Sequence, residues 1–200
     1  MRSRREDYSE STRSALVRSA VRLFTERGYA GTSLDEIARR ARVTKGALYH
    51  HFSGKQAVFE AAFDEVEAEV KGRLEKILTG SQPPWERALA GLREFIGSCL
   101  DPAYQRIALQ EAPVVMGWAR WREAEDRYSF GLIKQALQDL IDAGEVLAVP
   151  VEVTSRLLFG ALCSAATEIA HATDQRKVGE EIEDVVVRLL NQVRSAAPGT

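Results

Sequence analysis

Residues 31–56 read Gly31-Thr-Ser-Leu-Asp-Glu-Ile-Ala-Arg-Arg-Ala-Arg-Val-Thr-Lys-Gly-Ala-Leu-Tyr-His-His-Phe-Ser-Gly-Lys-Gln56, and this stretch decides the fold of the chain. Ser33 and Glu36 have the spacing of a capping box and predict the start of a short helix. Thr44 is a suitable N-cap for a second short helix over 45–51. Two short helices joined by a tight turn, behind a packed first helix, are typical of a helix-turn-helix.

The rest of the chain shows helical periodicity and no sustained alternation typical of strands. A first helix ends before Gly28, and a long helix opens near Ser53. We therefore expect an all-α protein of about nine helices. The predicted organisation is an N-terminal three-helix helix-turn-helix DNA-binding domain over 1–56 and a C-terminal helical domain over 57–200. Later helices are expected near 84–100, 102–112, 123–143, 151–172 and 177–195.

The charges are distributed unevenly along the chain. Residues 1–56 carry 12 Lys/Arg against 6 Asp/Glu, whereas residues 57–200 carry 15 against 23, so a basic module precedes an acidic one. A basic module is expected where one end of a protein meets a polyanion. The N-terminal arginines Arg2, Arg4 and Arg5 fit either a loose tail or an arm that enters the minor groove.

Several classes of function find no support in the sequence. No secretory signal or membrane-length apolar run is present, so we expect a cytoplasmic protein with no membrane partner. No nucleophile–base pair, phosphate-cradling loop or metal-ligand cluster is apparent, so we expect neither an enzyme nor a cofactor or metal. Cys99 and Cys163 fit buried thiols, with a redox switch as the alternative.

The predicted helix over 45–51 has one face suited to a DNA groove. Leu48 and Phe52, four residues apart, can face the core. Outward positions then hold a cation, a small residue that permits close approach, a phenol and imidazoles, which suit groove and phosphate contacts. Lys55 lies in the first turn of the next helix, where the positive end of the helix dipole favours an anion over a cation. The outward set is Lys45, Gly46, Tyr49 and His50, with His51 at its margin.

The stretch quoted above, and above all Lys45-Gly-Ala-Leu-Tyr-His-His-Phe-Ser-Gly-Lys55, resembles the helix-turn-helix of the tetracycline-repressor (TetR) family. The resemblance covers about residues 10–63. It implies phosphate contacts for Ser33, Tyr49 and Lys55, and contacts with base edges or the adjoining backbone for Lys45, Gly46 and His50. His51 matches a residue near the DNA backbone, although packing against the protein body is the alternative.

Position 42 departs from the family pattern, because Arg42 stands where glycine is common in the turn. If the turn needs a positive φ, Arg42 is strained by ~1 kcal/mol or more. Alternatively, Arg42 adopts another turn and reaches a phosphate. Ala47 also stands where Ser or Thr is common, which removes one polar contact. We include Arg42 and the N-cap Thr44 among the predicted DNA-binding residues.

The second domain holds two further predicted sites. Scattered aromatic residues fit either ordinary core packing or an apolar pocket, which in this family usually holds an effector. The predicted pocket residues are Phe95, Trp118, Trp121, Tyr128 and Phe159. The last two helices carry apolar faces that suit a two-fold four-helix interface between subunits, as the resemblance implies. The predicted interface residues are Leu158, Ala161, Ala165, Ile169, Ile182, Val186, Leu189 and Val193.

These patterns lead to one principal functional hypothesis. The chain is expected to be a repressor that binds a pseudo-palindromic double-stranded DNA operator as a homodimer and is released by a small apolar ligand. The first alternative is an activator or a regulator without an effector. The distant alternative is a helical small-molecule carrier or an enzyme.

Overall fold

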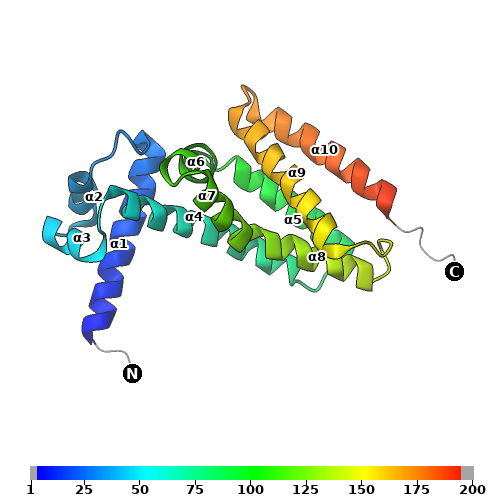
Figure 1. Cartoon of the computed structure of the whole chain (residues 1–200), viewed down its shortest axis with the longest axis horizontal. Coiled ribbons are helices and arrows are strands. Elements are labelled where there is room, and N and C mark those ends of the chain that lie inside the picture. The colour runs from blue at the N-terminus through cyan, green and yellow to red at the C-terminus, as the bar shows by residue number, and fades with distance from the viewer. Residues whose placement is uncertain (1–3, 195–200) are drawn as a thin grey trace. The chain divides into compact units, whose positions relative to one another are not determined.

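The computed structural model describes residues 4–194, without the side chains of residues 4–7, 125 and 126, and the described chain is almost entirely helical (Figure 1). The all-α prediction is confirmed. The predicted N-terminal arginine arm lies outside the described side chains. The elements are α1 Arg4–Arg27, α2 Leu34–Ala41, α3 Lys45–His51, α4 Lys55–Leu78, α5 Pro84–Cys99, the π-helix η1 Tyr104–Glu111, α6 Ala112–Val115, α7 Trp118–Glu125, the π-helix η2 Asp126–Phe130, α8 Gly131–Asp142, α9 Val151–His171 and α10 Gln175–Val193.

Contacts between residues divide the chain into two compact units. The first unit contains the residues up to Ala68 together with Pro102–Trp121, and the second contains Glu69–Asp101 and the chain from Arg122 onward. The sequence pattern did not indicate that 102–121 returns to the first unit. The functional boundary near residue 56 stays a prediction.

The core of the first unit lies where α1, α2, α3 and α4 meet. Leu16 and Phe24 of α1, Ile37 of α2, Leu48 of α3 and Phe59 of α4 are fully buried. The rings of Phe24 and Phe59 pack edge to face with their centroids 5.2 Å apart. Burying large apolar side chains from four helices fixes the short α2 and α3, which are too short to be stable alone.

Pro113, which follows the π-helix η1, leaves one of its carbonyls without a backbone donor. The N–H of Ala112 bonds to the carbonyl of Ile107, five residues earlier, as π geometry requires. Proline has no N–H, so Pro113 cannot extend this pattern to the carbonyl of Ala108. That carbonyl instead accepts the indole N–H of Trp121 at 3.1 Å, in a buried hydrogen bond. Trp121 therefore satisfies a backbone group that the helix cannot satisfy itself.

The second unit packs α5, α8, α9 and α10 against one another. Trp85 of α5 is buried with Leu140 and Val146, and the guanidinium of Arg194 lies 4.5 Å from the centroid of its ring. Gly179 of α10 is buried, and a Cβ at this position would lie 3.2 Å from the side chain of Ile96. The close approach of α10 to α5 therefore depends on a glycine.

Candidate nucleic-acid interface

The start of α2 has the predicted capping box. The Ser33 hydroxyl accepts the N–H of Glu36, and the Glu36 carboxylate accepts the N–H of Ser33 at 3.0 Å. The Ser33 hydroxyl also donates to Glu36 at 2.8 Å. These hydrogen bonds hold the pKa of Glu36 below its ordinary value, with the nearby Arg27 adding to the effect. A phosphate contact by Ser33 stays a prediction. To make it, the Ser33 hydroxyl would have to donate its hydrogen bond to the phosphate instead of to Glu36.

The turn between α2 and α3 places Arg42 in the left-handed region, with φ 58° and ψ 38°. Its backbone N–H bonds to the carbonyls of Ala38 and Arg39, so the conformation ends α2 and satisfies its last turn. The Arg42 side chain is exposed. The turn therefore has the positive φ of the first alternative, and a phosphate contact by the Arg42 side chain stays a prediction.

Helix α3 begins at the predicted cap and presents the predicted face. The Thr44 hydroxyl accepts the N–H of Ala47 at 3.2 Å. It donates no hydrogen bond to another described residue. Leu48 and Phe52 are buried, as predicted. On the other side, the set Lys45, Gly46, Tyr49 and His50 is exposed.

Gly46 is not required by packing within the chain. A Cβ at this position would meet no atom closer than the Thr44 hydroxyl, 4.0 Å away. Glycine has more conformational freedom to lose on folding than any other residue, and no contact among the described residues requires a glycine here. Close approach of an external backbone or groove wall is a physical reason for a glycine at an exposed position.

Lys45 is held in place by an acidic residue of the preceding helix. Its ammonium lies 2.8 Å from the carboxylate of Asp35. The hydrogen bond to Asp35 raises the pKa of Lys45, so the side chain stays charged. Because both groups are exposed, the pair contributes little to stability, but it fixes the direction of a flexible cation. The sequence analysis missed Asp35, since ten residues separate it from Lys45.

Lys55 begins α4, whose first turn contains no acidic residue. Its ammonium lies 4.4 Å from the centroid of the Tyr29 ring. No carboxylate among the described residues pairs with it. A cation and the free N–H groups of a helix start at the same place make a site for an anion. The sequence analysis missed Tyr29, because it lies outside the quoted stretch and reads as a core aromatic.

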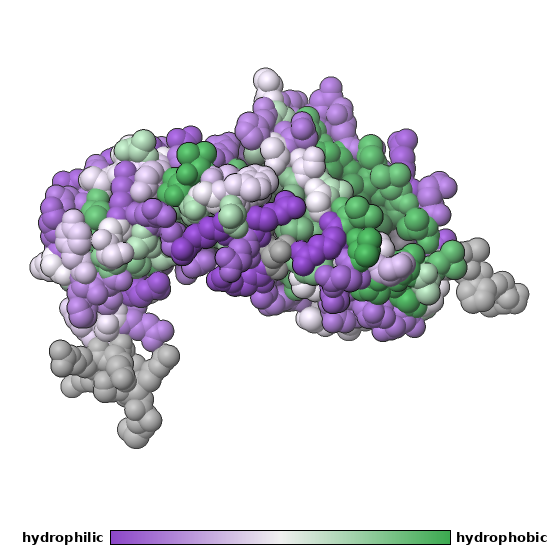
Figure 2. Space-filling model, in the orientation of Figure 1, coloured by the Kyte–Doolittle hydropathy of each residue, from purple (hydrophilic) through white to green (hydrophobic). Residues whose placement is uncertain are grey.

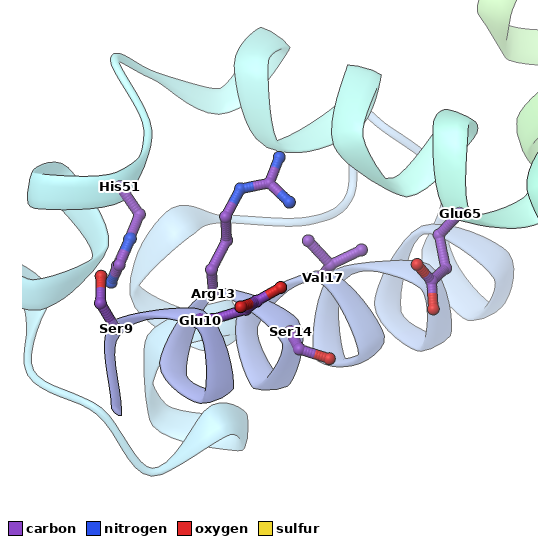
Figure 3. A pocket seen from close by; sticks show the side chains of 7 residues that line it. All are labelled: Ser9, Glu10, Arg13, Ser14, Val17, His51 and Glu65. Atoms are coloured by element: carbon purple, nitrogen blue, oxygen red, sulfur yellow. The ribbon is translucent and has the colours of Figure 1, made fainter. Parts of the chain in front are cut away.

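His51 faces an open groove of about 590 Å³ between α1, α3 and α4. In Figure 3, His51 and Glu65 lie at opposite ends of the groove, with Arg13 of α1 between them. The Arg13 guanidinium also lies 5.2 Å from the centroid of the Phe52 ring. Partial burial, followed by the charges of His50 and Arg13, holds the pKa of His51 below its ordinary value.

The aromatic residues predicted to line an effector pocket are distributed over both units. Trp118 and Trp121 belong to the first unit, whereas Phe95, Tyr128 and Phe159 belong to the second. Trp118 is 63% exposed, and Trp121 is buried with its N–H bonded to Ala108. Ligand binding at Trp118 and Trp121 stays a prediction, and the indole N–H of Trp121 already has the Ala108 carbonyl as its partner.

The other three aromatics are enclosed by the second unit. Phe159 is buried and packs edge to face with Phe130 at a centroid distance of 6.1 Å. Phe95 and Tyr128 are half-buried. The groove described above is lined by none of them. Ligand binding at Phe95, Tyr128 and Phe159 stays a prediction.

An apolar face covers α9 and α10, and Figure 2 shows hydrophobic residues gathered over these helices. Leu157 is 71% exposed and Leu189 63% exposed. Val153, Val185 and Val193 are exposed as well. Of the predicted interface residues, Ala161, Leu189 and Val193 are exposed, and Leu158, Ala165, Ile182 and Val186 are half-buried.

One predicted interface residue needs correction. Ile169 is fully buried, and its Cδ1 would lie 4.0 Å from a Cβ placed on Gly179. It therefore belongs to the core of its own subunit. The periodicity of α9 could not separate its two apolar faces, because both are hydrophobic between 157 and 166. Glu67 of α4 is buried as well. Its burial was not predicted, because a carboxylate beside an apolar stripe is expected at the surface.

Sequence comparison places this geometry in a known family. Residues 16–62 match the profile of "Bacterial regulatory proteins, tetR family", and residues 85–193, more than half of the chain, match "Tetracyclin repressor-like, C-terminal domain". The chain belongs to the TetR family. It is a TetR-family transcriptional regulator, and the exposed face of α3 lies in the DNA-binding module of that family.

Individual TetR-family relatives match most of the chain. The Tn10 TetC protein of Escherichia coli is 29% identical over 159 residues, which cover 78% of each protein. The regulator SrpR of Pseudomonas putida is 30% identical over 143 residues, 69% of this chain and 65% of SrpR. A TetR-family regulator of Pectobacterium atrosepticum has a crystal structure that superposes with a TM-score of 0.84 at 32% identity, covering 98% of this chain and 99% of that one.

Metal sites and membrane-spanning helices are the other classes of feature considered for the described residues. No group of three His, Cys, Asp or Glu side chains in the described part of the chain is arranged to hold a metal ion. No helix between residues 4 and 194 combines the length and apolar character that a membrane crossing requires.

Proposed function

We propose that this TetR-family regulator is a homodimeric repressor that binds a pseudo-palindromic DNA operator through α2 and α3 and is released by a small apolar effector. The observation that carries the proposal is the exposed face of α3. There Lys45 is directed by Asp35, and Gly46 is open to close approach. Tyr49 and His50 are exposed beside them.

The phosphate contacts in this proposal flank the recognition helix. Lys55 offers a cation at the start of α4 that pairs with no carboxylate in the part of the chain that the structure describes. In this proposal the Thr44 hydroxyl donates to a phosphate while it accepts the N–H of Ala47, and the exposed Arg42 contacts a phosphate from the turn. Such contacts fix the position of a protein on the duplex, whereas side chains in the groove read the bases. The proposal assigns base reading to Lys45, Gly46 and His50.

The dimer in this proposal forms through α9 and α10. Exposed Leu157 and Leu189 are the kind of large apolar residues that a subunit interface covers. Gly160 supports close packing of a second copy, since no atom of the chain lies within 4 Å of a Cβ placed there. A two-fold axis through this face would give two copies of α3, as a palindromic site requires.

The proposal also includes repression as the sign of regulation and release of the DNA by an effector. IcaR of Staphylococcus aureus, 42% identical over 45 residues, is named a negative transcriptional regulator. We take this sign of regulation for the chain and place the effector among Phe95, Tyr128 and Phe159 of the second unit. By linkage, an effector that weakens DNA binding is itself bound more weakly by the DNA complex, typically by 5–150-fold. An activator or an effector-independent regulator is the alternative.

Selection of bound duplexes from a random pool tests the operator. The expected result is a symmetric site whose half-sites lie about 34–36 Å apart or a multiple of this distance. Lys55→Ala should weaken all duplexes to a similar extent, whereas Lys45→Ala should also change base preference. Lys177→Ala removes an exposed cation from α10 and serves as the matched control. Enrichment of no symmetric sequence would contradict the proposal.

A compound screen against the operator complex tests effector release. The expected hits are small apolar compounds that dissociate the complex, and Phe95→Ala should reduce their effect while preserving DNA affinity without a compound. Compounds that bind and never change operator affinity would favour the effector-independent alternative. Transcription from a promoter that contains the operator then separates repression from activation.

A further inference from the structure

The turn after α1 is clamped by a segment that is distant in sequence. The backbone N–H of Tyr29 donates to one carboxylate oxygen of Glu111 at 2.7 Å, across 82 residues. The other oxygen accepts the Nε–H of Arg106 at 3.1 Å. Both Arg106 and Glu111 belong to η1, and all these residues lie in the first unit.

Gly28 makes this clamp sterically feasible. Its φ of +72° ends α1, and a Cβ at this position would lie 2.5 Å from both the Arg106 guanidinium and the Glu111 carboxylate. A side chain would therefore expel the clamp as well as strain the backbone. The η1 side chains occupy the space that the glycine leaves, and the turn cannot shift while they remain there.

The clamped turn carries the aromatic ring on which Lys55 rests. The Tyr29 ring stacks on Phe24 at a centroid distance of 5.9 Å and packs edge to face with Phe59 at 5.3 Å. Two buried rings thus fix its plane. The Lys55 ammonium lies 4.4 Å from the ring centroid, within the range of a cation–π contact.

We propose that Tyr29 and Glu111 are positioning residues for DNA binding: Tyr29 directs the Lys55 ammonium toward a phosphate, and Glu111 fixes Tyr29 through its backbone N–H. The inference rests on the proposed phosphate contact of Lys55. A lysine side chain has several rotatable bonds, and holding it before binding reduces the entropy lost when a phosphate is bound. The cation–π contact supplies this restriction without a carboxylate that would compete with the phosphate.

The first measurement follows Lys55 directly and needs no DNA. Lysines carrying ¹³C-methyl groups are observed by NMR, with the Lys55 signal assigned from its loss in Lys55→Arg. A methyl group above an aromatic face is shifted upfield, so the Lys55 signal should be upfield in the wild type. The shift should persist in Tyr29→Phe and disappear in Tyr29→Leu. Glu111→Ala should reduce it, and Glu111→Gln, which retains an acceptor oxygen, should preserve more of it.

The second measurement follows affinity for a random-sequence DNA duplex at low salt, since a phosphate contact does not depend on sequence. Tyr29→Leu should weaken binding by about 2- to 10-fold, the range expected when one more flexible side chain must be ordered on binding. In a Lys55→Ala background the same substitution should change affinity little. Tyr29→Phe should recover most of the wild-type affinity, and thermal unfolding should verify that each variant is folded at the assay temperature.

The two measurements distinguish the possible failures. A Lys55 signal that Tyr29→Leu leaves unchanged overturns the positioning role, whatever the DNA result. An equal loss of affinity from Tyr29→Leu with and without Lys55 also overturns it, because the ring then acts by another route. If Lys55→Ala leaves affinity unchanged, the proposed phosphate contact is wrong, and Tyr29 and Glu111 then have no positioning role in DNA binding. The NMR result would in that case describe the free protein alone.

Discussion

The hydrogen bond from Trp121 to Ala108 allows a quantitative test of how the π-helix is stabilised. Trp121→Phe removes the indole N–H but keeps a buried aromatic ring. The Ala108 carbonyl then loses a donor in a buried environment, and Pro113 offers no N–H to replace it. Leaving a buried acceptor unsatisfied costs about 1–3 kcal/mol. At ~2–4 °C for each kcal/mol in a chain of this size, the melting temperature should fall by roughly 2–12 °C.

A double-mutant cycle isolates the proposed cause. Pro113→Ala restores an N–H five residues after Ala108, so it should recover part of the stability lost in Trp121→Phe. In the wild-type background, where the carbonyl already has the indole, Pro113→Ala should bring no comparable gain. The difference between the two effects is the coupling energy, expected to be about 0.5–3 kcal/mol for groups that share one acceptor.

Chemical and thermal denaturation at a fixed protein concentration measure these effects, because an oligomer's stability depends on concentration. Trp118→Phe is the matched control, since Trp118 is 63% exposed and should change the free energy of unfolding by less than about 0.5 kcal/mol. The explanation is refuted if Trp121→Phe is as stable as the control. It is also refuted if Pro113→Ala has the same effect in both backgrounds.

Three further predictions concern the turn, the groove and the subunit interface. Arg42→Gly should be more stable than Arg42→Ala by about 1 kcal/mol in denaturant unfolding, because only glycine relieves the left-handed strain at φ 58°. DNA affinity should rise as the pH falls from 8 toward 6. The lowered pKa leaves His51 neutral in the free protein, whereas a bound phosphate would favour its protonated form. His51→Gln should therefore make DNA affinity less dependent on pH. Leu157→Asp should convert the dimer to a monomer in sedimentation, whereas Val114→Asp, at an 83% exposed position of the first unit, should not.

Each of these predictions has a distinct contrary result. Equal stability of the two Arg42 variants would mean that the turn carries no strain. A pH dependence that is unchanged in His51→Gln would show that another group is responsible for it. A dimer that survives Leu157→Asp would place the interface on another surface.

The sequence was informative wherever local chemistry determined the structure. Capping hydroxyls at Ser33 and Thr44 set the starts of α2 and α3, and both caps are present. Glycine at position 28 and the family pattern at position 42 both indicated left-handed residues, and the positive φ values agree. These features depend on neighbours within a few residues, so a single sequence contains their causes.

Features that depend on distant residues could not be predicted in this way. Tyr29 and Glu111 are 82 residues apart, and no spacing rule joins them. The hydrogen bond from Trp121 to Ala108 could not be predicted either, because a backbone carbonyl partner has no signature in the sequence. Ile169 looked like an interface residue because apolar periodicity does not distinguish a core from a subunit contact. The DNA contacts themselves involve a partner outside the chain and stay predictions.

The return of residues 102–121 to the first unit has a practical consequence for protein engineering. A fragment that stops after α4 would contain the whole helix-turn-helix but not η1, so the N–H of Tyr29 would lose Glu111. A chimera that joins residues 1–68 to the remainder of another regulator would inherit a foreign segment against the Gly28 turn. During synthesis, too, the first unit cannot be completed until Trp121 has emerged from the ribosome. Designs that graft the helix-turn-helix should therefore carry residues 1–68 and 102–121 together.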